Sequence, residues 1–326
     1  MFDDEILEKI TPTLIGKWPN TYVFTKCITE DMIKQEGRNL PMAVLRPSIV
    51  IASVDEPVVG WIDNYYGATG VFLGAALGVL RSLNGDKKNN AEMIPSDFVI
   101  NSGLAALWEI TCNKTLNNNV GSNETEARSE SRSDEIPIYN VVSSPESPIT
   151  WERFTNLLNL HAPAMATELQ VWYPYFALRP NRIHHLIVVF FLHTVPAYLV
   201  DFICYCIGKE PKMVKGYEKI NKFMNVLSYF TLREWKFYNK NVQNLWQKMG
   251  EEDRRLFQFS MTNFDWNNYI IYYTRGLRVY LLKDPLETIP KGKIKHRKLF
   301  VAHYTLIALL AFLFYKLVSL LWSYIL

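Results

Sequence analysis

The hydrophobic and polar positions of the first hundred residues alternate between helical and strand-like patterns. Residues 18–37, "WPNTYVFTKCITEDMIKQEG", predict a helix that begins at a cap on Asn20 or Thr21 and ends at Gly37. An earlier short helix is expected over residues 3–9, with a turn after Pro12. The apolar, β-branched run from Met42 to Arg46 then predicts a buried parallel strand, followed by a loop at Pro47. This order predicts an α/β sheet.

The same pattern continues to about residue 150 and then becomes mainly helical. A glycine-rich stretch over residues 60–78 lacks the G-x-G-x-x-G spacing, so it predicts a loop entering a tightly packed helix and not a phosphate loop. A short strand or turn is expected at Met93–Pro95, a helix from Ser96, and another strand in "IPIYNVVSS". From Trp151 on, Trp and Tyr recur at helical spacing, which is more typical of core packing than of a binding site.

Residues 113–135 interrupt this pattern. They are rich in Asn, Ser and Glu and poor in large apolar residues, so they cannot bury enough surface to become ordered. We expect a disordered insertion there.

The last residues, 299–326, form a nearly continuous apolar run with one charge at Lys316. Its length predicts a C-terminal transmembrane anchor, and a buried core helix is the alternative. The preceding segment 291–298, "KGKIKHRK", is strongly basic, which predicts that the bulk of the chain lies in the cytoplasm.

A second apolar run covers residues 186–207 and contains His193, Pro196 and Asp201. Basic residues flank it on both sides, which gives no orientation and argues against a simple span. We expect a helix pair that dips into the membrane interface or lines an apolar pocket, and a true span is the alternative.

Composition narrows the function classes. The net charge of +3 argues against nucleic-acid binding, and 49% hydrophobic with 14% aromatic residues suits a protein that is partly in lipid. The four cysteines show no Cys-x-x-Cys spacing, so neither a metal site nor a disulfide framework is indicated.

Tyr22 and Lys26 carry the candidate chemistry. Their i, i+4 spacing places a phenol and an ammonium on one face of the predicted helix. A neighbouring positive charge stabilises a phenolate and makes the phenol a better acid, and the same ammonium can reach a sugar hydroxyl of a nucleotide cofactor. Two ordinary surface residues are the alternative interpretation, because the motif is short.

Five short segments occur in the order and at the distances typical of one family: "WPNTYVFTK", "LRPSIV", "GWIDNYYGATG", "IPSDFVIN" and "IYNVVSSPESPITW". Together they are similar to the alcohol-forming fatty acyl-CoA reductases of insects, and "HTVPAYLVD" resembles that family's helical C-terminal domain. The resemblance implies an extended short-chain dehydrogenase (Rossmann-like) fold. It also implies NADPH-dependent reduction of long-chain acyl-CoA to fatty alcohol through a bound aldehyde.

The resemblance assigns roles to five residues. Tyr22 and Lys26 match the catalytic pair, with Tyr22 as proton donor and Lys26 also holding the nicotinamide ribose. Pro47, Ser48 and Ile49 match the loop that lies against the nicotinamide.

The resemblance also implies three regions. These are the remainder of an NADP-binding reductase domain at 1–148, a helical fatty acyl-CoA reductase domain at 149–295, and the anchor at 299–326, in the endoplasmic reticulum or the peroxisome.

In one respect the sequence departs from the family pattern. The glycine-rich turn that cradles the pyrophosphate and a catalytic Ser or Thr would both precede Met1. We therefore expect this chain to be incomplete for activity alone. The alternatives are a catalytically inactive membrane partner or regulator that associates with a full-length reductase, and a lipid-binding module.

Overall fold

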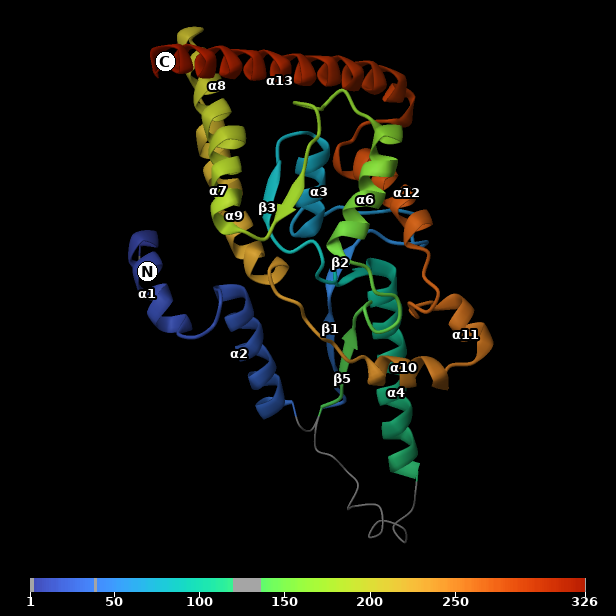
Figure 1. Ribbon diagram of the computed structural model, residues 1–326. Coiled ribbons are helices and arrows are strands. Elements are labelled where there is room, and N and C mark those ends of the chain that lie inside the picture. The colour runs from blue at the N-terminus through green and yellow to red at the C-terminus, as the bar shows by residue number, and fades with distance from the viewer. Residues whose placement is uncertain (1–2, 38–39, 120–135, 326) are drawn as a thin grey trace. The chain divides into compact units, whose positions relative to one another are not determined.

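A computed structural model describes residues 3–37, 40–119 and 136–325 (Figure 1). The chain divides into two compact units, and each is assembled from three segments. Unit 1 comprises Met1–Val50, Glu92–Pro148 and Glu234–Phe264, and unit 2 comprises Ile51–Ala91, Ile149–Arg233 and Asp265–Leu326. The consecutive domains predicted from the sequence share with this division only the passage from Pro148 to Ile149.

Unit 1 combines short strands with helices. Its elements are α1 (Asp4–Ile15), α2 (Thr21–Glu36), β1 (Val44–Pro47), β4 (Met93–Pro95), α4 (Ser96–Asn119), β5 (Ile138–Val141), α10 (Lys240–Lys248) and α11 (Glu251–Leu256), and β2 (Ile49–Ile51) begins in this unit.

The pairing of β1 with β5 is parallel, as predicted for the first strand, and its register runs from Val44 opposite Ile138 to Pro47 opposite Val141. The strand begins two residues later than predicted, where the Val44 N–H donates to the Pro137 carbonyl at 2.9 Å. The predicted loop after it is only Ser48, because β2 starts at Ile49 and pairs with β4.

The capping residues and glycines in the sequence predict the limits of α2 correctly but not those of α1. α2 has the predicted limits, since the Asn20 side chain accepts from the Val23 N–H at 3.0 Å and Gly37 follows the last residue. The predicted turn after Pro12 comes later than expected, because α1 continues through Pro12 to Ile15. The next residue, Gly16, has a φ of 56°, which stops the helix. The Thr11 hydroxyl donates to the Leu7 carbonyl at 2.6 Å beside the proline.

The predicted disordered insertion is helical in its first part. α4 extends to Asn119, so residues 113–119 belong to this helix. The remainder of the predicted insertion, 120–135, lies outside the described residues.

Unit 2 is mainly helical. Its elements are α3 (Ala68–Ala76), β3 (Ser82–Asn84), α6 (Trp151–His161), η2 (Ala162–Met165), β6 (Ala177–Arg179), α7 (Arg182–Val189), η3 (Phe190–Thr194), α8 (Val195–Cys206), α9 (Met213–Thr231), α12 (Trp266–Gly276), η4 (Leu277–Leu281), η5 (Leu286–Thr288) and α13 (Ile289–Ile325). β3 and β6 form a second parallel pair.

Aromatic side chains build the core of unit 2, as the helical spacing predicted. Phe154 of α6 is fully buried, and its ring lies 4.9 Å from that of Phe72 and 6.1 Å from that of Tyr273, centroid to centroid. Trp266 joins the same cluster at 6.2 Å from Phe154. These rings hold α3, α6 and α12 together.

Two helical stretches are long and apolar enough to cross a membrane by length and composition, Arg182–Cys206 and Leu286–Ser323. The first is one continuous run of α7, η3 and α8, and not the predicted helix pair. The second covers most of the predicted anchor 299–326, and the helix that carries it, α13, begins ten residues earlier, at Ile289.

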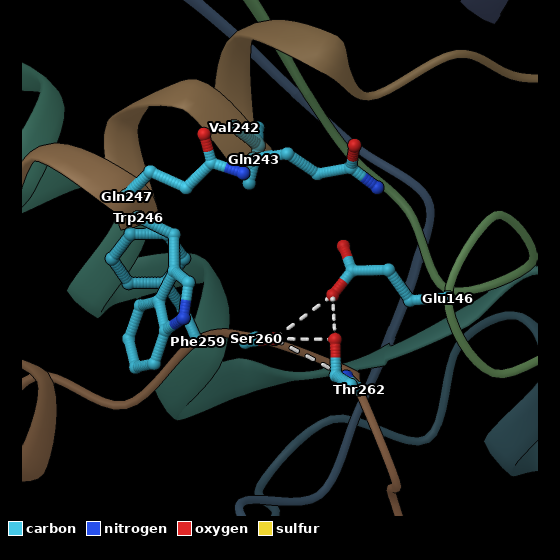
Figure 2. A pocket seen from close by; sticks show the side chains of 8 residues that line it. All are labelled: Glu146, Val242, Gln243, Trp246, Gln247, Phe259, Ser260 and Thr262. Atoms are coloured by element: carbon cyan, nitrogen blue, oxygen red, sulfur yellow. Dashed lines mark hydrogen bonds between the residues drawn. The ribbon is translucent and has the colours of Figure 1, made fainter.

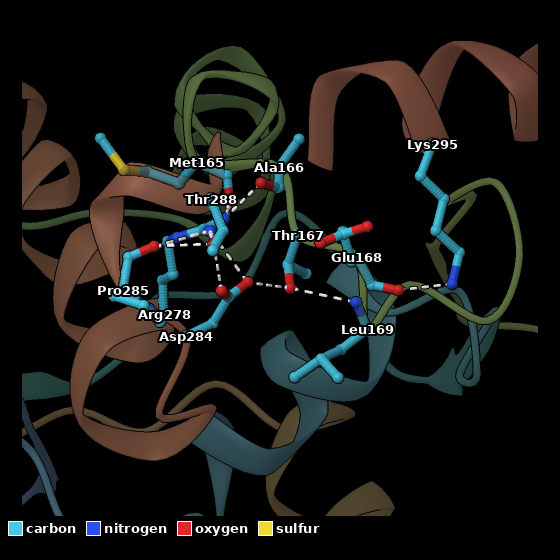
Figure 3. A network of polar contacts seen from close by, with 10 residues as sticks. All are labelled: Met165, Ala166, Thr167, Glu168, Leu169, Arg278, Asp284, Pro285, Thr288 and Lys295. Atoms are coloured by element: carbon cyan, nitrogen blue, oxygen red, sulfur yellow. Dashed lines mark hydrogen bonds and ion pairs between the residues drawn. The ribbon is translucent and has the colours of Figure 1, made fainter. Parts of the chain in front are cut away.

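A buried ion pair fixes the start of α13 (Figure 3). Arg278, 1% exposed, contacts the Asp284 carboxylate at 2.8 Å and donates to the Met165 and Pro285 carbonyls, both at 3.1 Å. The Thr167 and Thr288 hydroxyls donate to the same carboxylate. This network ties the residues between α12 and α13 to the segment after α6.

Candidate active site

Tyr22 and Lys26 lie on one face of α2, one turn apart, as the sequence predicted. The Lys26 Nζ is 5.9 Å from the centroid of the Tyr22 ring. Tyr22 is 66% exposed, and none of the described residues of α2 is buried. The phenol and the ammonium are therefore both accessible to a ligand on this face.

Glu30 lies one further turn along the same face and connects it to β1. Its carboxylate accepts from the Arg46 Nε at 2.8 Å and from the second guanidinium nitrogen of Arg46 in a two-point ion pair. The hydrogen bonds from Arg46 hold the pKa of Glu30 below its ordinary value, and they raise the pKa of Arg46. Arg46 directly precedes Pro47, so this ion pair holds the Tyr22 face of α2 to the end of β1.

The segment Pro47–Ile49 lies at the carboxyl end of β1. The Ser48 N–H donates to the Val141 carbonyl at 3.0 Å, and the Ile49 N–H donates to the Glu92 carbonyl at 2.9 Å. In open α/β sheets, ligands bind outside the carboxyl ends of the parallel strands. This edge is therefore the place where a cofactor is expected to bind.

Two residues at this edge, Glu92 and Ser143, were not predicted as site residues. Glu92 is 7% exposed, and one of its carboxylate oxygens accepts from the Ser144 N–H at 3.3 Å. Burial raises the pKa of Glu92. Among the described residues, no partner is present for the other Glu92 oxygen or for the hydroxyls of Ser48 and Ser143, although all three atoms are buried.

Unpaired buried polar atoms of this kind call for a hydrogen-bonding partner. Their position at the carboxyl edge beside Pro47–Ile49 fits a polar group such as a nicotinamide carboxamide. The only sequence signal concerns Ser143, which lies in "VVSSPES" directly after a predicted strand.

A separate cavity of about 130 Å³ in unit 1 is lined by Glu146, Val242, Gln243, Trp246, Gln247, Phe259, Ser260 and Thr262 (Figure 2). One oxygen of the Glu146 carboxylate accepts from the Ser260 hydroxyl at 2.9 Å, the Met261 N–H at 3.0 Å and the Thr262 hydroxyl at 3.1 Å. The other accepts from the Asn239 amide at 2.5 Å. These hydrogen bonds connect residues 239–262 to the loop after β5. Because both carboxylate oxygens already accept hydrogen bonds, Glu146 is not placed to act as an acid or base.

The described residues contain no group of three or more His, Cys, Asp or Glu that could hold a metal ion. The parallel strands, the Tyr–Lys pair on α2 and the polar edge beside Pro47 define a candidate site of the Rossmann-like reductase class.

Comparison with known proteins gives the family. Two models, both described as male sterility protein, match the chain: an NAD-binding module over residues 1–102 and a second module over residues 192–284. The curated relatives include fatty acyl-CoA reductase wat of Drosophila melanogaster, which is 40% identical over 94% of this chain and 56% of its own length. They also include fatty acyl-CoA reductase 1 of Rattus norvegicus, 33% identical over 90% and 53%, and fatty acyl-CoA reductase 2 of Bos taurus, 31% identical over 93% and 55%.

The chain belongs to the fatty acyl-CoA reductase family. This confirms the family inferred from the ordered motifs, and the NAD-binding module supports a nicotinamide cofactor. The chain spans about half the length of the curated relatives it matches.

Proposed function

We propose that this protein takes part in the NADPH-dependent reduction of long-chain fatty acyl-CoA to fatty alcohol, with the aldehyde held between two reductions. The observation that carries the proposal is the Tyr22–Lys26 pair, whose helix face is joined through Glu30 and Arg46 to the Pro47–Ile49 segment. When bound, NADPH supplies the hydride.

We assign the roles of the chain's own residues from the family resemblance, and their positions support the assignment. Tyr22 donates a proton to the substrate oxygen that becomes the alcohol. Lys26 stabilises the resulting phenolate and holds the nicotinamide ribose. Pro47, Ser48 and Ile49 form the segment that lies against the nicotinamide. The Ser48 hydroxyl has no partner among the described residues, which supports this role because it can form a hydrogen bond with the nicotinamide.

We also propose that α13 anchors the protein in the membrane of the endoplasmic reticulum or the peroxisome, with the bulk of the chain in the cytoplasm. The support is its length, its apolar composition and the absence of any buried residue from its most apolar window. The basic segment 291–298 fits the cytoplasmic side.

The test measures fatty alcohol formed from a long-chain acyl-CoA and NADPH by membranes that contain the protein. It is run on this chain alone and on this chain co-expressed with the portion of the Drosophila relative that the match leaves uncovered. Replacing the phenol in Tyr22→Phe is expected to lower kcat by about 100- to 10,000-fold, the usual contribution of a general acid.

Tyr238→Phe is the matched control, because Tyr238 is also in unit 1 and is 81% exposed. It should leave the rate unchanged. Equal alcohol formation by Tyr22→Phe and the unmodified protein would contradict the role of Tyr22, and no alcohol in either arrangement would contradict the reductase function.

A second candidate function is a catalytically inactive partner of a full-length reductase. The open face of α2, with no buried residue among those described, favours it because this face is free to contact another chain. Co-purification from native membranes tests it: the proposal requires an intact reductase in the purified complex and fails if this chain is recovered without one.

A further inference from the structure

The helical run Arg182–Cys206 has one predominantly apolar outer face, with the exposed His184 near its start. Its side chains recur at intervals of three and four residues and are each more than half exposed. They are Ile183, Leu186, Ile187, Phe190, Phe191, Tyr198, Leu199, Phe202, Ile203 and Tyr205. A contiguous exposed apolar surface of this extent marks an interaction site.

The inner face of the same run is fixed to the rest of unit 2 by polar contacts. His185 Nδ1 lies 2.7 Å from the Ser82 hydroxyl, and His193 Nε2 accepts from the Arg81 N–H at 3.0 Å. The His193 ring also stacks on Tyr217 of α9, with centroids 5.1 Å apart. The run therefore cannot leave β3 and α9 without breaking these contacts.

α9 lies beside α8 and carries charge. The Asp201 carboxylate of α8 accepts from the N–H groups of Lys212, Met213 and Val214, at 2.8 to 3.0 Å, and so caps the start of α9. The exposed residues of α9 include Lys215, Glu218, Lys219 and Lys222. If the run crossed a bilayer, Asp201 and these charged side chains would enter the hydrocarbon with it, at a cost of several kcal/mol.

The surroundings of the outer face identify lipid as its partner. Arg182 lies at one end of the run, and the exposed Lys209 and Lys215 lie near the other, where they can contact anionic headgroups. The phenols of Tyr198 and Tyr205, 60% and 75% exposed, are of the type that favours the boundary between headgroups and acyl chains.

We propose that the outer face of α7, η3 and α8 lies in the surface of the membrane, parallel to its plane, and is a second membrane contact in addition to α13. The inference rests on the proposed membrane location and not on the proposed reduction. A depth of about 5 to 10 Å is typical of such interfacial helices.

The experiment uses the full chain in vesicles of phosphatidylcholine and phosphatidylserine, with the four native cysteines replaced by serine. Flotation with the vesicles is checked first. A nitrobenzoxadiazole label is then placed at Ile183→Cys, Phe191→Cys or Ile203→Cys, and its quenching by nitroxide lipids of shallow and deep position is compared. Lys219→Cys on α9 is the matched control.

All three outer-face labels are expected to be quenched more strongly by the shallow nitroxide than by the deep one, with the Lys219 label quenched least. Stronger quenching of the Phe191 label by the deep nitroxide, with the labels at 183 and 203 shallow, would mean a span and overturn the inference. Flotation without quenching of these labels would also overturn it while leaving the α13 anchor intact. Absence of flotation would overturn both, and neither readout depends on alcohol formation.

Discussion

Glu30 shows how a residue outside the proposed chemistry can set the position of residues within it. It lies on the face of α2 that carries Tyr22 and Lys26, and its two-point ion pair with Arg46 crosses to the strand that leads into Pro47. The spacing of Tyr22 and Lys26 could be found in the sequence because both belong to one helix. Glu92 and Ser143 could not, because their burial depends on chain segments that are distant in sequence.

Arg46→Gln is expected to loosen α2 with only a small loss of overall stability. A partly exposed ion pair contributes about 0.2 to 1 kcal/mol to the free energy of unfolding, so the main effect should be faster hydrogen exchange of the amides in 21–36. Lys87→Gln, which breaks the Lys87–Glu152 pair of unit 2, is the control and should leave exchange in α2 unchanged.

The effect should depend on pH in a defined direction. Arg46 lowers the pKa of Glu30 from an ordinary value of 4.5, so the pair stabilises the fold above that pH and its contribution is lost as the pH falls through the lowered value. The difference between Arg46→Gln and the unmodified protein should therefore disappear in acid. A difference that stays constant from neutral pH down to strongly acidic pH would contradict this account.

At the scale of elements, local signals predicted starts and stops well where a cap or a glycine decides them. α2 begins at its Asn20 cap, and α4 begins at Ser96 after β4, both as expected. The two π-helices in the described part of the chain, η3 and η4, could not be predicted in this way. Each contains a residue that is 1% exposed, His193 or Arg278, and that is bound to backbone atoms far away in sequence.

Arg278→Met is expected to lower the free energy of unfolding by about 3 to 5 kcal/mol, because it leaves the Asp284 carboxylate without its buried partner. Chemical denaturation of the detergent-solubilised chain measures this. Arg275→Met is the matched control, since Arg275 lies in the preceding turn and is exposed, and it should cost little. If the two variants lower the free energy of unfolding equally, the network in Figure 3 does not stabilise the start of α13.

At the scale of the whole molecule, the family and the Rossmann-like class could be predicted, but the division into units could not. The chain passes between units at residues 50–51, 91–92, 148–149, 233–234 and 264–265. Only the third passage coincides with a visible change, from an α/β pattern to a helical one. The other four passages between units lie in stretches whose composition does not change. The hydrophobic pattern there gives no sign that the chain enters a different unit.

The fragment 1–148 is therefore expected not to fold. It lacks 234–264, which supplies the four donors to Glu146 and buries Leu245 and Phe259 in unit 1. Circular dichroism and hydrogen exchange should show a largely unfolded chain, whereas a control that ends at residue 298 retains all the segments of unit 1 and should keep its protected amides. A cooperatively folded 1–148 would contradict the assignment of 234–264 to unit 1.

The three-segment construction of each unit also has a consequence during synthesis. Residues 234–264 leave the ribosome only after 149–233 have been made, so unit 1 stays unfinished while most of unit 2 is already outside the exit tunnel. During that interval the apolar run 186–207 is already outside the ribosome, whereas the proposed membrane anchor α13 has not yet been made. The two units therefore cannot fold strictly one after the other in the order of their synthesis.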